Sequence, residues 1–508
     1  MNRQGKHGHF AVLIVFACFM FPALLYKSLL SLSQRTKDRE GGSSRTRRSV
    51  ELEKNTSAPI VILDKACLMP TMDDFPGDFM TQYQRKHGGA IFHFLLAMYM
   101  FIGLATVCDD YFVPSLEKIA LKLRLSSDVA GATFMAVGTS APELFAAIIG
   151  VFITEGDIGL AAVVGSGMFN VLFVLAICAL FAGSVLPLSR WPLLRDSFCY
   201  LMSIAALVFV TYDEKVYWYE ALALVCMYLL YVAMMYFNRE LERRFLRSVL
   251  SRKEDDDVEG NITNDENKTL LPHQDNEDGI VSPFSSSGVQ EIEVILPANE
   301  LPSSTPRGII SWTLWIIKSP VTCLFYLTIP DCRKDRWENW YYVSFVACLV
   351  WTAILSYVLV WMLAIIGFTL AIPGVIMGLT FLAAGSSVPE GISSLIVARR
   401  GDGDMAVSHA IGSNVFNILF CLGVPWLLKT TFVHLGGHVD VVSGSMSYTS
   451  LCLFASVIFP LVFIALNRWY LNKFLGMIFL VLYLAFVAVA TLFGLNLLGD
   501  FNEKTCKS

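Results

Sequence analysis

Residues 138–143 read GTSAPE, and residues 385–390 read GSSVPE. Each motif lies in the middle of a long apolar stretch, where its Gly and Pro residues interrupt a helix. Pro142 offers no amide hydrogen to the carbonyl of Gly138, and Pro389 has the same effect in the second motif. A freed carbonyl inside a bilayer needs a partner, and a cation can be one. The motifs therefore predict two broken transmembrane helices with oxygen atoms at each break.

The two motifs are part of a longer internal repeat. Residues 131–172 align with residues 378–419 at a constant offset of 247 residues, without a gap. Gly, Thr, Phe, Ala, Ser, Pro and Glu recur at matching positions around the motif, and the pairs Gly-Asp, Gly-Ser and Phe-Asn recur after it. Chance does not account for this match, so the chain contains two related halves.

Composition places the chain in a membrane. It is 55% hydrophobic and 16% charged over 508 residues, whereas soluble domains carry about 25% charged residues. Nucleic acid is not an expected partner, and the lipid bilayer is. The expected fold class is an all-α polytopic membrane protein. Apolar stretches that approach the ~20 residues of a membrane span occur at residues 90–113, 127–153, 158–182, 197–213 and 217–237, and again at 341–366, 373–398, 403–428, 446–466 and 473–496.

The other segments differ in composition. Residues 1–26 have a basic start and an apolar run, which is typical of a signal peptide or signal anchor. Residues 27–89 are polar and carry a glycosylation sequon, as in an extracytoplasmic segment. Residues 238–308 begin basic and become acidic and Asn-rich, which predicts a partly disordered cytoplasmic loop. Residues 309–330 are apolar but contain a Lys and a Pro, which favours an interfacial helix.

Charge in the short loops sets the orientation of the spans, because Lys and Arg favour the cytoplasmic side. If residue 89 is outside, Lys and Arg gather in the inward loops, and the exceptions are Lys215 and Lys429. Five spans in each repeat, at 90–237 and 341–496, mean that the second repeat enters the membrane from the opposite side. Such inverted repeats place a substrate site near the midplane, at the interface between them.

Two acidic residues mark that site. Glu143 and Glu390 lie in the middle of their spans, where an ionised side chain costs roughly 2.5–3.5 kcal/mol on insertion scales. The central parts of the spans offer no Lys or Arg to neutralise them. A single buried Glu is compatible with a structural role, in an ion pair or protonated. A pair at equivalent positions indicates a function, and oxygen ligands of this kind suit the hard cations Ca2+ and Na+.

A second polar pair follows each Glu. Ser166 and Asn170 are spaced i, i+4 and share one helix face, and Ser413 and Asn417 repeat this spacing. Alone, such a pair is more often a packing contact between membrane helices. Because each Asn follows its Glu by the same 27 residues, the duplication predicts cation ligands.

The charged residues near the ends of the spans are not assigned to the site. Asp109, Asp110, Arg195 and Asp196 are expected to be solvated at the interface. Asp157 and Asp404 open their spans, where an acidic group stabilises a helix N-terminus.

At these motifs the sequence resembles the cation/Ca2+ exchanger superfamily, and most closely its potassium-dependent sodium/calcium exchanger branch. The repeats, residues 107–117 (VCDDYFVPSLE) and residues 331–334 (DCRK) carry the resemblance, which covers nearly all of 75–495. It implies two inverted repeats of five helices, alternating access, and Na+-coupled Ca2+ antiport through the two Glu residues as shared carboxylates. The further ligands that it implies are Thr139, Ser140, Ser166, Asn170, Ser386, Ser387, Ser413 and Asn417.

Two residues depart from that branch. Its members normally carry Asp at the positions of Glu390 and Asn417, and the second Asp is tied to the use of potassium. Asn417 removes one negative charge that could offset a bound K+, so the resemblance leaves K+ co-transport open. Our hypothesis is that K+ dependence is weakened or absent.

Two other functions fit parts of the pattern. One is a Ca2+/H+ antiporter on the same scaffold, although the Ser and Asn residues favour Na+. The other is a Ca2+-binding membrane regulator that does not transport. An enzyme is not expected, since the segments outside the spans contain no nucleophile–base set or phosphate-binding loop, and no cofactor is implied. The expected location is the plasma membrane, with a secretory-pathway membrane as the alternative.

Overall fold

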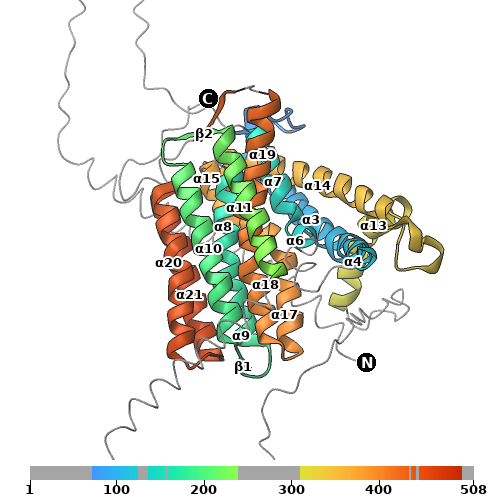
Figure 1. Cartoon of the computed structure of the whole chain (residues 1–508). Coiled ribbons are helices and arrows are strands. Elements are labelled where there is room, and N and C mark those ends of the chain that lie inside the picture. Colours follow the sequence, from blue (N-terminus) through green and yellow to red (C-terminus); the bar gives the residue numbers. More distant parts are fainter. Residues whose placement is uncertain are drawn as a thin grey trace, which may run out of the picture.

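A computed structural model of the chain describes residues 71–123, 136–154, 158–237, 309–433, 436–441 and 446–494. Most of these residues are helical (Figure 1). The predicted signal segment 1–26, residues 27–70 of the predicted extracytoplasmic segment, and the predicted loop 238–308 lie outside the described residues.

The first half runs from Thr71 to Tyr236. Its elements are η1 (Thr71–Asp74), α2 (Gln82–Gln84), η2 (Arg85–Gly89), α3 (Ala90–Val107), η3 (Cys108–Phe112), α4 (Val113–Lys122), α6 (Ala136–Thr139), α7 (Ala141–Phe152), α8 (Ile158–Met168), η5 (Phe169–Val174), α9 (Leu175–Phe181), β1 (Leu186–Pro187), α10 (Arg190–Val210), β2 (Lys215–Tyr217) and α11 (Trp218–Tyr236).

The second half follows α13 (Ile309–Thr328) and η6 (Asp335–Trp340). Its elements are α14 (Tyr341–Leu370), α15 (Gly374–Met377), η7 (Gly378–Leu382), α16 (Ala383–Ser386), α17 (Val388–Arg399), α18 (Gly403–Phe416), η8 (Asn417–Leu422), α19 (Gly423–Leu428), η9 (Lys429–Val433), β3 (His438–Asp440), α20 (Met446–Leu466), β4 (Tyr470–Leu471) and α21 (Lys473–Gly494).

The helical content agrees with the predicted all-α membrane fold. Among the described residues, eight helices are long and apolar enough to cross a membrane, and Gly374–Ser386 with Val388–Arg399, bent by 44° where they meet, make a ninth if the bent pair is counted as one span. The helix Ala141–Phe152 is apolar but shorter. Together with α6 it matches the predicted span at 127–153, part of which lies outside the described residues.

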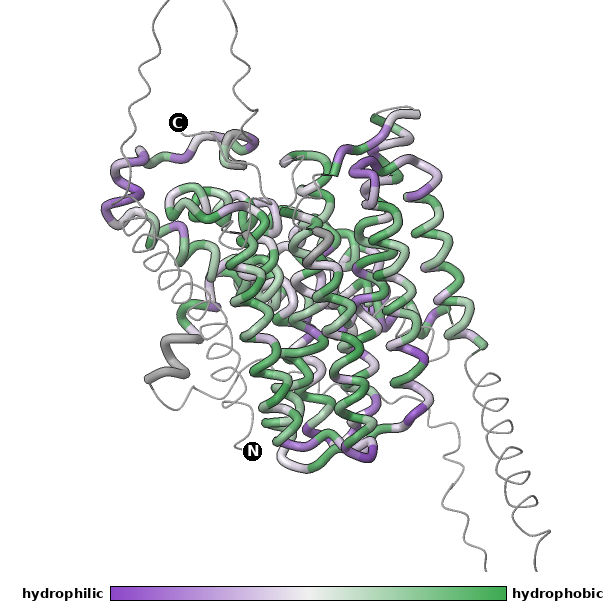
Figure 2. The backbone as a smooth tube through the Cα atoms, turned by 90° about the vertical axis from the view of Figure 1, so that its left-hand side faces the viewer, coloured by the Kyte–Doolittle hydropathy of each residue, from purple (hydrophilic) through white to green (hydrophobic). Residues whose placement is uncertain are grey.

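The spans form a bundle with an inclined pair at its side. In Figure 1, α8, α10, α11, α18, α20 and α21 stand side by side, while α3 and α14 slope away from them. The helices α3 and α14, which open the two halves, pack along each other. Figure 2 shows apolar residues along the body of the bundle and polar residues at its two ends. This distribution suits a bilayer around the middle of the bundle.

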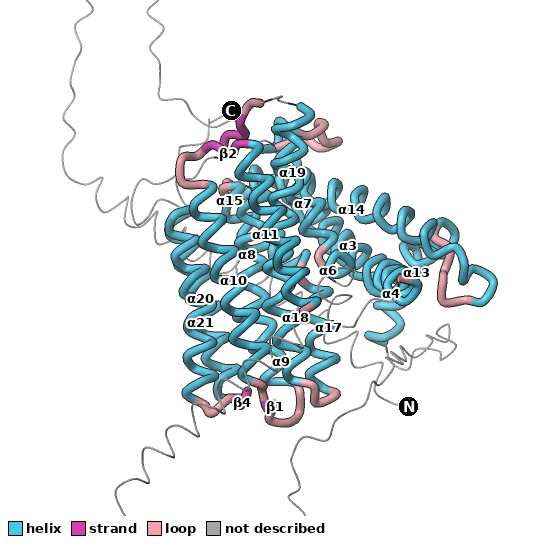
Figure 3. The backbone as a smooth tube through the Cα atoms, viewed as in Figure 1, coloured by secondary structure: helices cyan, strands magenta, loops and turns pink. Residues whose placement is uncertain are grey.

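Two short β-pairs tie the halves together at opposite ends. Strand β1 pairs antiparallel with β4, and β2 pairs antiparallel with β3. Figure 3 places β2 at one end of the bundle and β1 with β4 at the other. β1 and β3 both follow the third span of their half, yet they lie at opposite ends. The second half is therefore inverted relative to the first, as the odd number of spans predicted.

Several boundaries differ from the prediction. The first span is part of a longer helical run, Gln82–Lys122, which continues through two π-helical segments. A non-helical Gly88 with φ of 117° kinks its start. Ile309–Thr328 is helical as predicted and packs against α3, and its interfacial location stays a prediction.

The prediction for Asp196 was wrong. Its side chain is fully buried, within 2.7 Å of Arg195 Nε, and it accepts a hydrogen bond from the Ser408 hydroxyl of α18. The pairing partner and the hydroxyl replace water around this carboxylate, which explains how α10 can bury it. Asp404 opens α18 as predicted, and its carboxylate accepts hydrogen bonds from the Ser189 amide and hydroxyl at 2.6 and 2.5 Å.

Candidate cation site

Two broken helices meet inside the bundle at their breaks. Ser140 separates α6 from α7, and Ser387 separates α16 from α17, each with a ψ near zero that departs from the helix. The breaks fall two residues before Pro142 and Pro389, so each proline occupies the first turn of the following helix. Each Glu lies in that same first turn, where the partial positive charge of the helix N-terminus favours a carboxylate.

The two motifs exchange hydrogen bonds across the repeat. The Ser140 hydroxyl donates to Glu390 Oε1 at 2.9 Å, and the Ser387 hydroxyl donates to Glu143 Oε1 at 3.0 Å. Ser386 also lies beside the Glu143 carboxylate. Both Glu side chains are 0% exposed. The two contacts join the same pairs of positions in opposite order, so the site has the symmetry of the inverted repeat.

Each carboxylate keeps one oxygen unused. Glu143 Oε2 and Glu390 Oε2 are buried and have no hydrogen-bond partner among the described residues. No Lys, Arg or His of the described chain forms an ion pair with either Glu. A buried carboxylate without such compensation is expensive in a membrane interior. A bound cation would supply the positive charge that these two carboxylates need.

The two Asn residues occupy equivalent irregular positions. Asn170 is the second residue of the π-helical segment η5, and Asn417 is the first residue of η8. A π-helical segment widens one turn and is frequent at functional sites. Element η5 packs against α17, and η8 packs against α7. Each Asn is therefore carried by an element that lies next to the Glu-bearing helix of the opposite half.

The predicted polar ligands differ in how they are engaged. Asn170 Oδ1 and Ser413 Oγ are buried without a partner among the described residues, and both are oxygens of the kind that hard cations bind. Asn417 is buried with an unpartnered Nδ2. The Ser166 hydroxyl donates to Val163 O at 2.9 Å within its own helix. Thr139 is 5% exposed and lies directly before the first break.

Two buried polar residues near the Asn residues were not predicted from the sequence. Asn414 is fully buried and accepts a hydrogen bond from Asn170 Nδ2 at 3.1 Å. Tyr200 is fully buried in α10, and its hydroxyl would lie 2.3 Å from a Cβ added at Gly167. The repeat pairs Asn414 with Gly167, a mismatch that hides it from a search for equivalent residues.

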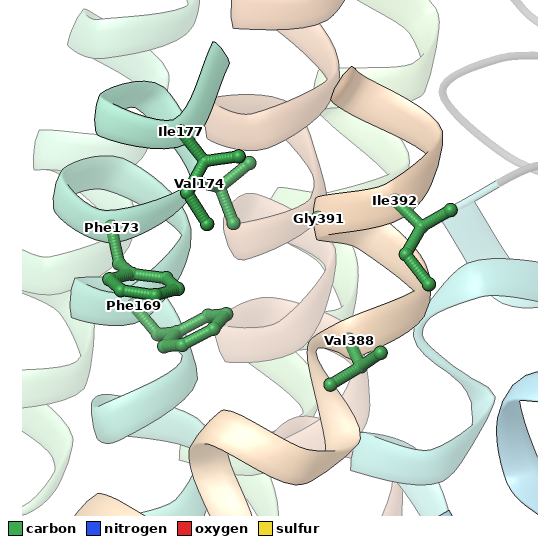
Figure 4. A pocket seen from close by; sticks show the side chains of 7 residues that line it. All are labelled: Phe169, Phe173, Val174, Ile177, Val388, Gly391 and Ile392. Atoms are coloured by element: carbon green, nitrogen blue, oxygen red, sulfur yellow. The ribbon is translucent and has the colours of Figure 1, made fainter. Parts of the chain in front are cut away.

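An apolar pocket adjoins the site between η5–α9 and α17. It is lined by Phe169, Phe173, Val174, Ile177, Val388, Gly391 and Ile392. Figure 4 shows the two Phe rings on one helix facing the other helix, where Gly391 carries no side chain between Val388 and Ile392. Phe169 precedes Asn170, and Gly391 follows Glu390. The pocket therefore lies between the two elements that carry Asn170 and Glu390.

One of the two lysines that depart from the predicted charge pattern is buried. Lys429 is 5% exposed, and its Nζ donates to Val151 O at 2.6 Å, at the end of α7. A cation at a helix C-terminus is favourable because the last carbonyls are unpaired. Lys429 therefore caps α7, and the chain gives it a structural partner away from the two carboxylates.

Comparison with known proteins finds a matching family and similar relatives. The pattern of the family described as "Sodium/calcium exchanger protein" matches residues 93–237 and 340–492. Human sodium/potassium/calcium exchanger 3 is 37% identical, with 87% of this chain and 86% of that protein covered. Human sodium/potassium/calcium exchanger 5 is 38% identical, with 87% and 91% covered.

A similar solved structure is that of the sodium-calcium exchanger NCX_Mj, with a TM-score of 0.43, 20% identity, and 78% of this chain and 99% of that chain covered. The family pattern covers both halves and reaches across each broken helix, and the two human relatives cover most of the chain. The chain belongs to the sodium/calcium exchanger protein family.

Proposed function

We propose that this multi-pass membrane protein is a Na+-coupled Ca2+ antiporter that binds both ions at Glu143 and Glu390. The polar ligands are Thr139, Ser140, Ser166, Asn170, Ser386, Ser387, Ser413 and Asn417. The observation that carries this proposal is the reciprocal pairing of each Glu with a Ser of the other half. Each carboxylate also keeps one buried oxygen unpartnered among the described residues.

The shared site suits alternating access. Each carboxylate belongs to one half and its hydroxyl donor to the other, so both contacts cross the interface between the halves. A site at the interface of inverted repeats can open toward either side while its ligands remain in place. Ca2+ takes carboxylate, hydroxyl and carbonyl oxygens. Na+ can use the same oxygens, so the two ions compete for one set of ligands.

The decisive experiment measures 45Ca2+ movement in vesicles that contain the full-length protein. An imposed Na+ gradient is expected to drive Ca2+ transport in the wild type, whereas choline in place of Na+ abolishes it. Glu143→Gln and Glu390→Gln keep the shape of the side chain and remove its charge, so each is expected to abolish transport. Undiminished transport in either variant, at equal expression, contradicts the proposed site.

The same vesicles separate the two alternatives. A Ca2+/H+ antiporter would move Ca2+ in choline when a pH gradient is imposed. A Ca2+-binding regulator would bind 45Ca2+ without accumulating it inside the vesicles. We expect transport that follows the Na+ gradient and is unaffected by the pH gradient alone.

We further propose that the K+ dependence of transport is weakened or absent, because Asn417 is uncharged. The human relatives carry potassium in their names, so the contrast is testable within one family. Na+-driven Ca2+ flux in the wild type is expected to be similar with and without K+. Asn417→Asp adds a carboxylate and is expected to make the flux rise when K+ is added. A wild type that needs K+ refutes this part of the proposal.

The plasma membrane is the proposed location, with a secretory-pathway membrane as the alternative. The eight helices long and apolar enough to span and the family membership make the chain a multi-pass membrane protein. Surface biotinylation of intact cells distinguishes the two locations.

A further inference from the structure

Asn170 and Asn417 occupy equivalent positions of the repeat, yet their side-chain amides have different hydrogen-bond partners. Asn170 Nδ2 donates to Asn414 Oδ1, which leaves Asn170 Oδ1 buried without a partner among the described residues. At Asn417 it is Nδ2 that lacks a partner, while Oδ1 lies 3.7 Å from the Cys421 thiol. A cation binds an amide through its oxygen, so Asn170 is the amide that is already turned for binding.

The orientation of Asn170 follows from the surroundings of Asn414. Asn414 Nδ2 lies 3.0 Å from Ala410 O and 3.4 Å from Gly167 O. A backbone carbonyl can only accept, so the group that faces these two oxygens must be the NH2 group of Asn414. Its oxygen then faces Asn170, which must present its own NH2 group. The two backbone carbonyls that orient Asn414 therefore also fix the orientation of the Asn170 amide. One of them, Gly167 O, belongs to the same half as Asn170.

The first half has no equivalent of this arrangement. The position that matches Asn414 is Gly167, which has no side chain to hold Asn417. The Tyr200 hydroxyl fills the space that a side chain at position 167 would need, because a Cβ added at Gly167 would lie 2.3 Å from it. The Tyr200 hydroxyl itself has no partner among the described residues. The difference between the two amides therefore comes from one unmatched position in the repeat.

We propose that Asn414 is a positioning residue that holds the side-chain oxygen of Asn170 toward the cation, an inference that rests on the proposed function. It touches the ligand and not the ion. Asn414 is 0% exposed and lies in α18, which packs against η5. Without Asn414 the Asn170 amide is free to rotate and present either its oxygen or its NH2 group. The affinity for the ion falls because the ligand is no longer oriented before binding.

A double-mutant cycle tests this role in the full-length protein. The variants are Asn414→Ala, Asn170→Ala and the double variant, and the measurements are equilibrium 45Ca2+ binding to purified protein and half-saturating Ca2+ in the flux assay. Asn414→Ala is expected to weaken Ca2+ binding about 10-fold, equivalent to about 1.4 kcal/mol. In the Asn170→Ala background the same change is expected to cost less than about 2-fold, because Asn414 acts through Asn170.

One further variant tests the orientation and another controls for folding. Asn414→Asp keeps an oxygen that can accept from Asn170 Nδ2 but loses the NH2 group that faces the carbonyls of Ala410 and Gly167, so it is expected to weaken Ca2+ binding as Asn414→Ala does. Thr491→Val removes a buried hydroxyl whose bond at 2.7 Å goes to Val487 O in α21, and it is expected to leave Ca2+ binding unchanged. An Asn414→Ala loss of equal size in the wild-type and Asn170→Ala backgrounds would show that residue 414 matters for packing and would overturn the proposal.

The outcomes separate this inference from the proposed function. A wild type that binds Ca2+ but shows no Na+-driven flux contradicts antiport and leaves the binding cycle interpretable. A wild type that transports, together with an Asn414→Ala effect of equal size in both Asn170 backgrounds, contradicts the positioning role alone.

Discussion

Ser140 and Ser387 each connect the two halves through a single hydroxyl. Each donates to a carboxylate oxygen of a fully buried Glu. A hydrogen bond to a charged group contributes about 1.5–3 kcal/mol, and it helps keep the carboxylate ionised in an apolar interior. A carboxylate that is harder to ionise is a weaker ligand for a cation.

The symmetry of these contacts gives a prediction for a matched pair of variants. Ser140→Ala and Ser387→Ala are each expected to raise half-saturating Ca2+ about 10-fold, the equivalent of about 1.4 kcal/mol. The two increases should agree within a factor of about 3, since the geometry is the same at 2.9 and 3.0 Å. The check is the Ca2+ dependence of Na+-driven flux. An effect confined to one variant would contradict the equivalence of the two pairs.

The sequence predicted these residues better than it predicted their contacts. Two Glu residues in apolar spans are visible without a structure, because nothing nearby in the sequence neutralises them. That Ser140 binds the Glu of the other half, 250 residues away, depends on how the halves meet. Asn414 was missed because a search for matching positions discards a position where the repeat has Gly167.

At the scale of elements, glycines allow the two halves to approach closely. A Cβ added at Gly165 of α8 would lie 2.4 Å from Leu379 O of η7, which is too close for a carbon and an oxygen that are not bonded to each other. The equivalent glycine of the second half, Gly412, would place its Cβ 3.3 Å from the Tyr231 hydroxyl, the end of a side chain that can shift. The two glycines therefore match in the sequence and differ in what surrounds them.

Alanine at these two positions provides a test with a built-in control. Gly165→Ala places a methyl group against the backbone oxygen of Leu379, so the two elements must move apart. The variant is expected to destabilise the fold by about 1–3 kcal/mol or more. Gly412→Ala is expected to be close to neutral. The measurement is thermal unfolding of the purified protein in detergent, followed by fluorescence. A melting temperature of Gly165→Ala equal to that of the wild type would show that α8 and η7 are less tightly packed than the structure indicates.

The elements themselves were predicted unevenly. The broken helices followed from Gly and Pro within apolar runs, and the structure breaks both at the matching serine. The π-helical segments at Asn170 and Asn417 have no comparable signal, because an added residue in one turn leaves the composition unchanged. The burial of Asp196 also escaped prediction, because its hydroxyl partner Ser408 comes from a helix of the other half.

At the scale of the molecule, the positions of the two β-pairs show that the halves are inverted relative to each other. β1 pairs with β4 at one end of the bundle, and β2 pairs with β3, with β2 at the other end (Figure 3). The predicted orientation places β1 and β4 on the cytoplasmic side, where Arg190, Arg468 and Lys473 lie next to these strands. The same orientation places the first described residues, before Gln82, outside.

Cysteine labelling tests both the inversion and its direction. Asp440 of β3 and Tyr470 of β4 are exposed, so cysteine at either position can be reached by a reagent. With a membrane-impermeant maleimide, Asp440→Cys is expected to be labelled in intact cells, and Tyr470→Cys after permeabilisation, each above the level of the parent chain. Labelling of both positions in intact cells would contradict the inverted arrangement. The reverse order would instead retain the inversion and turn the whole molecule over in the membrane, because charge in the loops alone fixes that choice.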